Sequence, residues 1–254
     1  LEIQENAYLE IAPTGSLTVN GTITNNVANG NDGIILHSDA TGTGSLIHST
    51  PNIGGTVESY FNGTRYHYVS SPIDAASTAM FNTNNFYYWD ASTEWGGMGA
   101  SPPATIDYTP WNSKTNGNLS VTAGYAYYYY STTLEYKGNM NQGEYTFTTD
   151  KSATGTIDDQ GWNFFGNPYP SAINWDDIVA EASFPANIET AIYFFDDADG
   201  TGVQNNYKYY VPGGAGPGGP YGVGTEATSG DIPIGQGFFV KTDVDAESFI
   251  VNNT

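Results

Sequence analysis

Apolar and polar residues alternate in short runs over the first 50 positions. Residues 1–3, 7–11 and 15–19 carry an inward Leu and an Ile or Val in phase, at a spacing of eight residues. Such alternation predicts strands, and a short repeat with Gly or Asn between its units is typical of a parallel β-solenoid. Residues 33–36 and 44–47 continue the pattern as less regular rungs. A plain β-meander would show the same alternation and is the alternative.

The pattern changes from about residue 57. Aromatic-rich runs at 66–69, 86–89 and 125–130 are separated by loops of Gly, Pro, Asn and Ser. This spacing favours a β-sandwich or a jelly roll. One short helix is expected at 171–180, where Pro170 precedes apolar residues at a spacing of three to four.

A second, longer repeat relates the two parts of the aromatic-rich region. Four landmarks recur in the same order, with offsets that grow from 96 to 115 residues: 66–72 with 162–168, 86–90 with 192–196, 121–127 with 232–238, and 134–136 with 249–251. We therefore predict an all-β chain, with a short solenoid-like layer followed by a duplicated sandwich or jelly-roll-like module and one short helix. The expected domains are 1–56 and 57–254, the latter built from related halves at about 57–150 and 151–254. Chance similarity between tyrosine-rich strands is the alternative.

Charge and composition exclude several classes of partner. The 254 residues include 6 Lys and Arg against 27 Asp and Glu, a formal charge of −21, and no cysteine. Such a charge repels phosphate backbones and anionic membrane surfaces, so we expect no nucleic-acid partner. No run of 18 apolar residues occurs, and we expect no membrane insertion. The richness in Gly, Asn, Thr, Ser and Tyr is typical of exported proteins, which predicts an extracellular or cell-surface location.

Two motifs carry a resemblance to a known group. Residues 161–171 (GWNFFGNPYPS) and 234–241 (IGQGFFVK) resemble a β module that recurs in large exported surface proteins of Bacteroidetes. Residues 39–48, which lead to 66–72, look like the stretch that commonly precedes that module. The resemblance implies secretion by the type IX route, in hosts that are adhesins, repeat-containing surface proteins or enzymes with accessory modules. It transfers no catalytic residue.

The densest group of potential metal ligands lies in one acidic turn. Asp196, Asp197 and Asp199 precede Gly200, which can turn the backbone. Hard carboxylate oxygens at this density suit Ca²⁺ as a cofactor, although the turn lacks the twelve-residue loop of an EF-hand. A solvated acidic turn, with no cofactor, is the alternative.

Tryptophans beside acids and amides indicate where a sugar would bind. Sugar rings stack on Trp and Tyr while their hydroxyls need fixed polar partners, and Trp89, Asp90, Trp95 and Trp111 lie in such a context. Surface glycans are therefore candidate partners. Core packing, or the anchoring of loops by their own side chains, is the alternative.

Support for catalysis is thin, and we expect no enzyme. Of the three histidines, His37 and His48 follow apolar triplets, a place typical of surface or turn residues. Common hydrolase and zinc-protease motifs are absent. A paired-carboxylate glycosidase would need Glu94, Glu135 and Glu144 in one cleft.

These features predict a non-catalytic structural or adhesive module of a larger secreted surface protein. The chain begins in mid-repeat at Leu1, so we expect a terminal rung that pairs with copies of the chain or with neighbouring domains. The charge argues for ordered association, such as fibres, that strengthens as salt screens repulsion. The alternatives are a carbohydrate-binding, lectin-like module and an accessory part of a secreted glycoside hydrolase.

Overall fold

A computed structural model describes residues 1–93, 110–153, 160–196, 207–214, 225–227 and 229–253. The described chain is mainly β, with several sheets and one short α-helix, which confirms the predicted fold class. No helix among these residues has the length and apolar character needed to cross a membrane.

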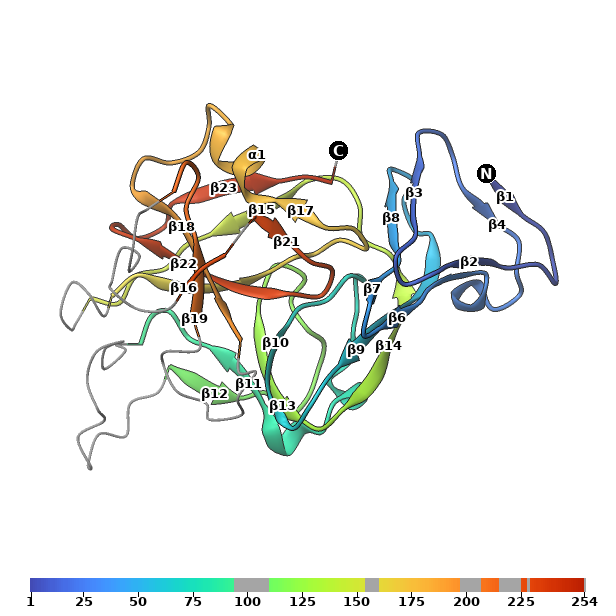
Figure 1. The fold of residues 1–254 in the computed structure, drawn as a ribbon, viewed down its shortest axis with the longest axis horizontal. Coiled ribbons are helices and arrows are strands. Elements are labelled where there is room, and N and C mark those ends of the chain that lie inside the picture. Colours follow the sequence, from blue (N-terminus) through green and yellow to red (C-terminus); the bar gives the residue numbers. More distant parts are fainter. Residues whose placement is uncertain (94–109, 154–159, 197–206, 215–224, 228, 254) are drawn as a thin grey trace.

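The N-terminal segment forms two stacked coils (Figure 1). The first coil has β1 (Glu2–Ile3), β2 (Leu9–Ile11) and β3 (Ser16–Val19); the second has β4 (Thr24–Asn25), β5 (Ile34–Leu36) and β8 (Ser45–His48). The pairs β1–β4, β2–β5 and β3–β8 are all parallel, so the predicted parallel rungs are confirmed. The repeat of about eight residues is therefore the distance along the chain between successive sides of one coil. Strands that pair with each other are separated by a whole coil.

One strand joins the coils to the rest of the chain. β9 (Gly54–Phe61) pairs in parallel with β5 and antiparallel with β14 (Thr132–Asn139), which gives a sheet of order β14-β9-β5-β2. A small hairpin of β6 (Ser38–Asp39) and β7 (Gly42–Thr43) leaves the second coil beside β9.

Two central sheets follow, and they share one strand order. The first runs β10 (Arg65–Val69), β13 (Tyr125–Tyr129), β11 (Phe86–Trp89), β12 (Trp111–Ser113). The second runs β16 (Trp162–Gly166), β22 (Gly237–Thr242), β18 (Ile188–Phe195), β19 (Tyr207–Tyr210), β20 (Thr225–Glu226). The first four strands of both sheets are antiparallel neighbours in corresponding positions. The boundaries at 56 and 150 stay a prediction.

Contacts between the two central sheets are also paired. Val69 bridges Gln236 and Phe165 bridges Ala123, while the Ser70 amide donates to Gly235 O at 2.9 Å and the Gly166 amide donates to Thr122 O at 3.0 Å. These contacts make Ala123 equivalent to Gln236. The repeat found in the sequence aligned position 123 with position 234, which is two residues before Gln236. That alignment was based on matching glycines and aromatic residues, which do not determine the register of the strands.

The sheets stack in four layers with three apolar cores between them. The sheet β14-β9-β5-β2 packs on the first central sheet through a core that includes Val57, Tyr127 and Tyr136. The two central sheets face each other through aromatic side chains, among them Tyr68 and Phe239. The fourth layer, formed by β15 (Tyr145–Thr148), β23 (Ser248–Val251) and a helix, covers the outer face of the second sheet.

The helix is α1 (Trp175–Ala180), and it begins later than residue 171. Residues ahead of it form β17 (Ile173–Asn174), which pairs with β21 (Asp231–Ile232). Asn174 Oδ1 caps α1 by accepting from the Asp176 amide at 2.9 Å and from the Asp177 amide at 3.4 Å. Three 3₁₀ turns complete the helical elements of the described chain: η1 (Gly30–Asp32), η2 (Thr78–Met80) and η3 (Thr83–Asn85).

The GNPYPS motif forms a buried joint between the layers. Asn167 Nδ2 donates to the carbonyls of Ser171, Ile232 and Pro233 at 2.8, 3.0 and 3.0 Å. Tyr169 is fully buried, and its hydroxyl bonds the carbonyls of Gly143 and Val251 at 2.6 and 2.7 Å. Pro170 O accepts from the Leu46 amide of the second coil at 2.8 Å. The motif therefore has a structural role.

Candidate functional site

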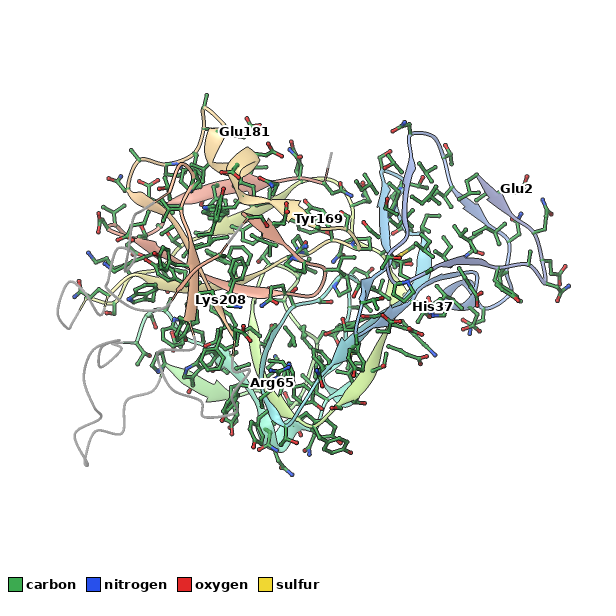
Figure 2. The ribbon with its side chains drawn as sticks, in the orientation of Figure 1. Glu2, His37, Arg65, Tyr169, Glu181 and Lys208 are labelled. Carbon is green, nitrogen blue, oxygen red and sulfur yellow. The ribbon has the colours of Figure 1, made fainter. Side chains whose placement is uncertain are left out.

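A cleft of about 460 Å³ opens where the N-terminal coils meet the two central sheets. Its walls are the β6–β7 hairpin, the turn between β9 and β10, the end of β18 and the loop before β22. We call it the larger cleft, because a smaller one is described below. Its lining includes the polar and aromatic side chains of Asp39, Tyr60, Arg65, Tyr66 and Gln236. Arg65 stands at the start of β10 (Figure 2).

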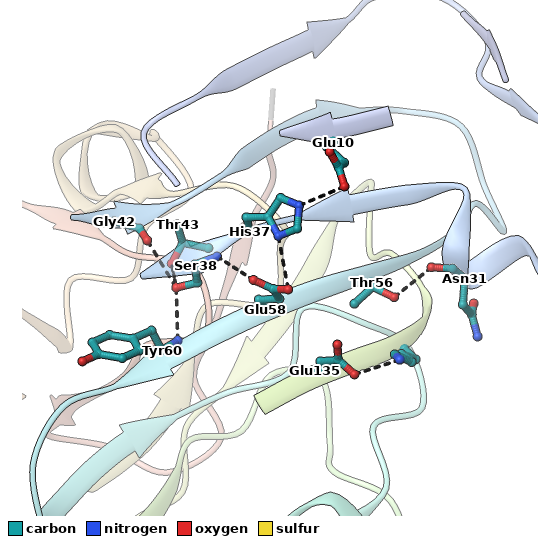
Figure 3. Close-up of polar contacts among 11 residues, drawn as sticks. Glu10, Asn31, His37, Ser38, Gly42, Thr43, Thr56, Glu58, Tyr60 and Glu135 are labelled. Atoms are coloured by element: carbon teal, nitrogen blue, oxygen red, sulfur yellow. Dashed lines mark hydrogen bonds and ion pairs between the residues drawn. The ribbon is translucent and has the colours of Figure 1, made fainter. Parts of the chain in front are cut away.

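Hydrogen bonds hold the hairpin wall of the larger cleft against β9. Buried Ser38 pairs its hydroxyl with that of Thr43 at 2.7 Å and accepts from the Tyr60 amide at 3.1 Å. The Ser38 amide donates to Glu58 Oε2 at 3.0 Å (Figure 3). This wall is thus tied to the sheet before any ligand arrives.

Among its described lining residues, the larger cleft carries the cation Arg65 and the carboxylates Asp39 and Asp196. Asp39 Oδ1 accepts from the hydroxyl and the amide of Thr41 at 2.6 and 2.7 Å, and these bonds hold the pKa of Asp39 below its usual value. Arg65 is the chain's only arginine. Its Nε donates to Asn62 O at 2.6 Å, and it forms no ion pair with another described residue.

Aromatic rings form much of the remaining lining of the larger cleft. Phe195 stacks on Tyr68 at 5.2 Å between ring centroids, and the Tyr68 hydroxyl meets that of Tyr207 at 2.6 Å. The ring centroids of Tyr66 and Tyr128 lie 5.0 Å apart, and the half-buried Tyr60 also lines the cleft. The cleft therefore combines fixed charges with aromatic surface.

A smaller cleft of about 270 Å³ lies by the end of β11. Trp89 and Asp90 line it together with Asp150 and Asn163. The Asp150 amide donates to Asn163 Oδ1 at 2.8 Å, and Asn163 Nδ2 donates to Asp150 O at 2.9 Å. Burial, and secondarily a hydrogen bond and charge repulsion from Asp245, raise the pKa of the Asp150 carboxyl.

The two clefts are equivalent under the shared strand order. Corresponding positions line both clefts: the end of β18 or β11, the residues before β22 or β13, and the middle of β10 or β16. These positions hold Phe195 and Asp196, Gly235 and Gln236, and His67 and Tyr68 in the larger cleft, and Trp89 and Asp90, Thr122 and Ala123, and Asn163 and Phe164 in the smaller one. Each cleft thus takes walls from both central sheets. The N-terminal hairpin extends only the larger one.

The described tryptophans of the predicted sugar site lie in the aromatic core between the central sheets. Trp89 and Trp111 face each other across β11 and β12 with ring centroids 5.0 Å apart. Trp89 Nε1 donates to Trp162 O at 2.7 Å, and both rings pack on Phe239. Such contacts are expected from the alternative in which the tryptophans pack in the core. Trp89 also lines the smaller cleft together with Asp90. Trp95 lies outside the described residues.

Only one member of the predicted calcium turn is described. Asp196 Oδ2 pairs with Lys208 Nζ at 2.5 Å, which supplies a positive charge to this carboxylate. Asp197 and Asp199 lie outside the described residues. Within the described residues no group of three His, Cys, Asp or Glu side chains is placed to hold a metal ion. The calcium site stays a prediction.

The two described glutamates considered for a glycosidase line neither cleft. Glu135 is exposed on β14 and pairs with Lys137 at 2.8 Å. Glu144 is exposed just before β15, and neither residue lines a cleft described above. Glu94 lies outside the described residues.

The histidines differ from one another in environment. His37 is a half-exposed surface residue as expected, with Nε2 3.5 Å from Glu10 Oε1 and Nδ1 3.2 Å from Glu58 Oε1 (Figure 3). The expectation of a surface place for His48 is wrong, because its residue is only 2% exposed. Strand alternation puts His48 on the same inward side as Leu46, and that signal was present in the sequence.

Apart from Asp196, the charged and amide side chains of the larger cleft were not predicted from the sequence as site residues. Asp39, Arg65 and Gln236 come from three distant segments, and no short motif links them. The one available signal was the presence of a single arginine in a strongly acidic chain.

A family model described as a domain of unknown function (DUF8693) matches residues 1–254. No curated protein and no solved structure matches the chain.

Proposed function

We propose that this chain, which belongs to the DUF8693 family over residues 1–254, is a non-catalytic structural and adhesive module of an extracellular surface protein. In this proposal, copies of the module join through strand edges and build a fibre. The acidic, cysteine-free composition and the resemblance to exported surface modules support the extracellular setting. The open edge of the first coil carries the proposal.

That edge consists of strands paired on one side only. Within the described residues β1, β2 and β3 each pair with one strand of the second coil and with no other. The Leu9 amide donates to Gly33 O, and Ile11 O accepts from the His37 amide, both at 2.9 Å. Because alternate residues of a strand bond to opposite sides, the amide and carbonyl of Glu10 point away from β5. Such groups are a template for another strand.

Side chains beside the edge fit the same role. Leu1 and Tyr8 are 49% and 66% exposed, although both are large and apolar. A partner strand would cover them, which favours association. Glu2, Glu5 and Glu10 place negative charge at the same end, so association is opposed at low ionic strength.

Sedimentation velocity tests the proposal. The isolated chain should sediment as larger species in about 0.5 M salt than in about 0.02 M salt, because the Debye length falls from roughly 20 Å to 4 Å. Glu10→Pro removes the outward amide of β2 but no bond of β2 to β5, and should abolish the salt-induced species.

Glu10→Ala is the matched control, since it also loses the Glu10 to His37 contact yet keeps the amide. It should associate at least as well as the wild type because it removes one negative charge. A wild type that stays monomeric at both salt concentrations would contradict the proposal, as would equal association of the Pro and Ala variants.

A hydrolase would have to be argued from the two aspartates of the smaller cleft. Asp150 has a raised pKa, as a general acid requires, and Asp90 lines the same cleft. However, Asp90 Oδ1 already accepts from the Ser92 amide at 3.1 Å and from its hydroxyl at 2.6 Å. The pKa of Asp150 is raised first by burial and then by Asp245, and the charge of Asp90 adds a smaller contribution. Because Asp90 is already held by Ser92, we propose that the module has no catalytic activity.

A further inference from the structure

We infer that the larger cleft is a binding site for a neutral saccharide. The inference rests on the cleft's own side chains and is independent of the strand edge that carries the proposed function. It concerns residues that differ from the tryptophans considered in the sequence.

The lining supplies both kinds of contact that a sugar needs. Tyr60 and Tyr66 are half-buried, so part of each side chain is anchored while part remains exposed at the cleft. Arg65, Asp39 and Gln236 lie in the same lining and offer donors and acceptors to hydroxyl groups. Aromatic faces with a few fixed polar groups are the usual composition of a site for a small polar ligand.

Several of the polar groups are already oriented by the protein. Asp39 is held by Thr41, as described above, and Arg65 Nε is held by Asn62 O. Gln236 Nε2 donates to Gly237 O at 2.7 Å and to Tyr68 O at 3.3 Å. Pre-oriented groups lose little conformational entropy on binding, so the site does not have to be assembled by its ligand.

The balance of charge selects a neutral ligand. Arg65 and Asp39 offset each other within the lining, and Asp196 is paired with Lys208. The formal charge of the chain is −21, so polyanionic sugars approach against the field of the whole protein. A neutral saccharide meets neither obstacle, and its hydroxyls can donate to Asp39 and accept from Arg65.

The equivalent cleft indicates that this lining is not required by the scaffold. The smaller cleft has Ala123 where the larger has Gln236, and by the same strand register Gly161 stands where the larger has Arg65. Gly161 has φ +75°, and a Cβ there would lie 2.0 Å from Thr242 O, so no side chain fits. Arg65 and Gln236 are therefore additions to one cleft that the shared strand order does not require.

Isothermal titration against hexasaccharides of glucose, mannose, xylose and N-acetylglucosamine tests the inference, with a galacturonic acid hexamer as the anionic comparison. At least one neutral hexasaccharide should bind the full chain with a Kd below about 1 mM. Tyr60→Ala and Arg65→Gln should each weaken that binding about tenfold or more, or about 1.4 kcal/mol, because one removes a ring contact and the other a charged hydrogen bond.

Tyr88→Ala in the smaller cleft is the matched control and should change the Kd less than about twofold. Thermal unfolding of each variant separates loss of the site from loss of the fold, and Arg65→Gln carries the test if Tyr60→Ala fails to fold. The inference is overturned if no neutral hexasaccharide binds, if only the anionic one binds, or if Tyr88→Ala abolishes binding while Arg65→Gln does not. None of these results depends on strand-edge assembly, which sedimentation measures separately.

Discussion

The side chain of Asn167 illustrates how single residues hold this fold. It is fully buried, donates to three carbonyls and accepts from the Tyr169 amide at 2.9 Å. Burying backbone groups without a partner is costly, and of these carbonyls Pro233 O has a second donor, the Gln236 amide at 3.2 Å. The Asn167 side chain thus fixes the backbone of the GNPYPS motif, whose Pro170 O accepts from the Leu46 amide of the second coil.

Replacing that amide should destabilise the whole chain. We expect Asn167→Ala to lower the free energy of unfolding by about 3 kcal/mol, because several buried groups lose their partner at once. Asn26→Ala is the matched control, since its Nδ2 donates only to exposed Glu2 Oε1, and it should cost less than about 0.5 kcal/mol. Urea unfolding measures both values, and equal effects would contradict the role given to Asn167.

A buried histidine gives the stability a pH dependence. Burial lowers the pKa of His48 below its ordinary value of 6.5, so the folded chain resists protonation while the unfolded chain accepts it. The unfolded state then binds more protons, and stability is lost as pH falls below about 6.5.

The variant His48→Gln should lack this part of the pH dependence. Between pH 7.5 and 5.5 the wild type should lose more free energy of unfolding than His48→Gln, with urea unfolding as the measurement. Carboxylate titration is common to both chains, so the difference isolates His48. Losses of equal size in the two chains would mean that His48 is not held neutral by the fold.

The roles of single residues were hard to predict from the sequence. Trp89 with Asp90 has the composition of a sugar site, yet the same letters describe a core residue at a strand end, and only the facing sheet decides between them. Asn167 stood within a recognisable motif, but its three acceptors lie on distant or irregular segments. Burial by another sheet is a tertiary property that no local pattern contains.

At the scale of elements the sequence was informative, and its errors concern register. Alternation located the rungs, the aromatic strands and the helix, because period-two and helical spacing are local properties. It did not distinguish the sides of one coil from stacked coils, since both show inward Leu and Ile. The offset at Ala123 was misplaced by two residues for a related reason, because a shift of two keeps every side chain on its face.

Across the whole molecule, the shared strand order is combined with an asymmetric addition. The coils extend the outer layer of the first central sheet through β5 and β9. The outer layer of the second central sheet has no such extension among the described strands, because β15 pairs only with β23 there. The coils thus contribute the hairpin that enlarges one cleft, and they present the open edge of β2 at one end of the molecule (Figure 1). Both proposals depend on this addition.

Hydrogen exchange at the amide of Glu10 tests strand-edge assembly most directly. This amide points away from β5, whereas the Leu9 amide donates to Gly33 O at 2.9 Å within the coil. We predict that Glu10 exchanges fast in dilute chain at low salt and slows at least tenfold in concentrated chain at high salt, while Leu9 is protected in both. Fast exchange at Glu10 under both conditions, with Leu9 protected throughout, would contradict assembly through the edge of β2.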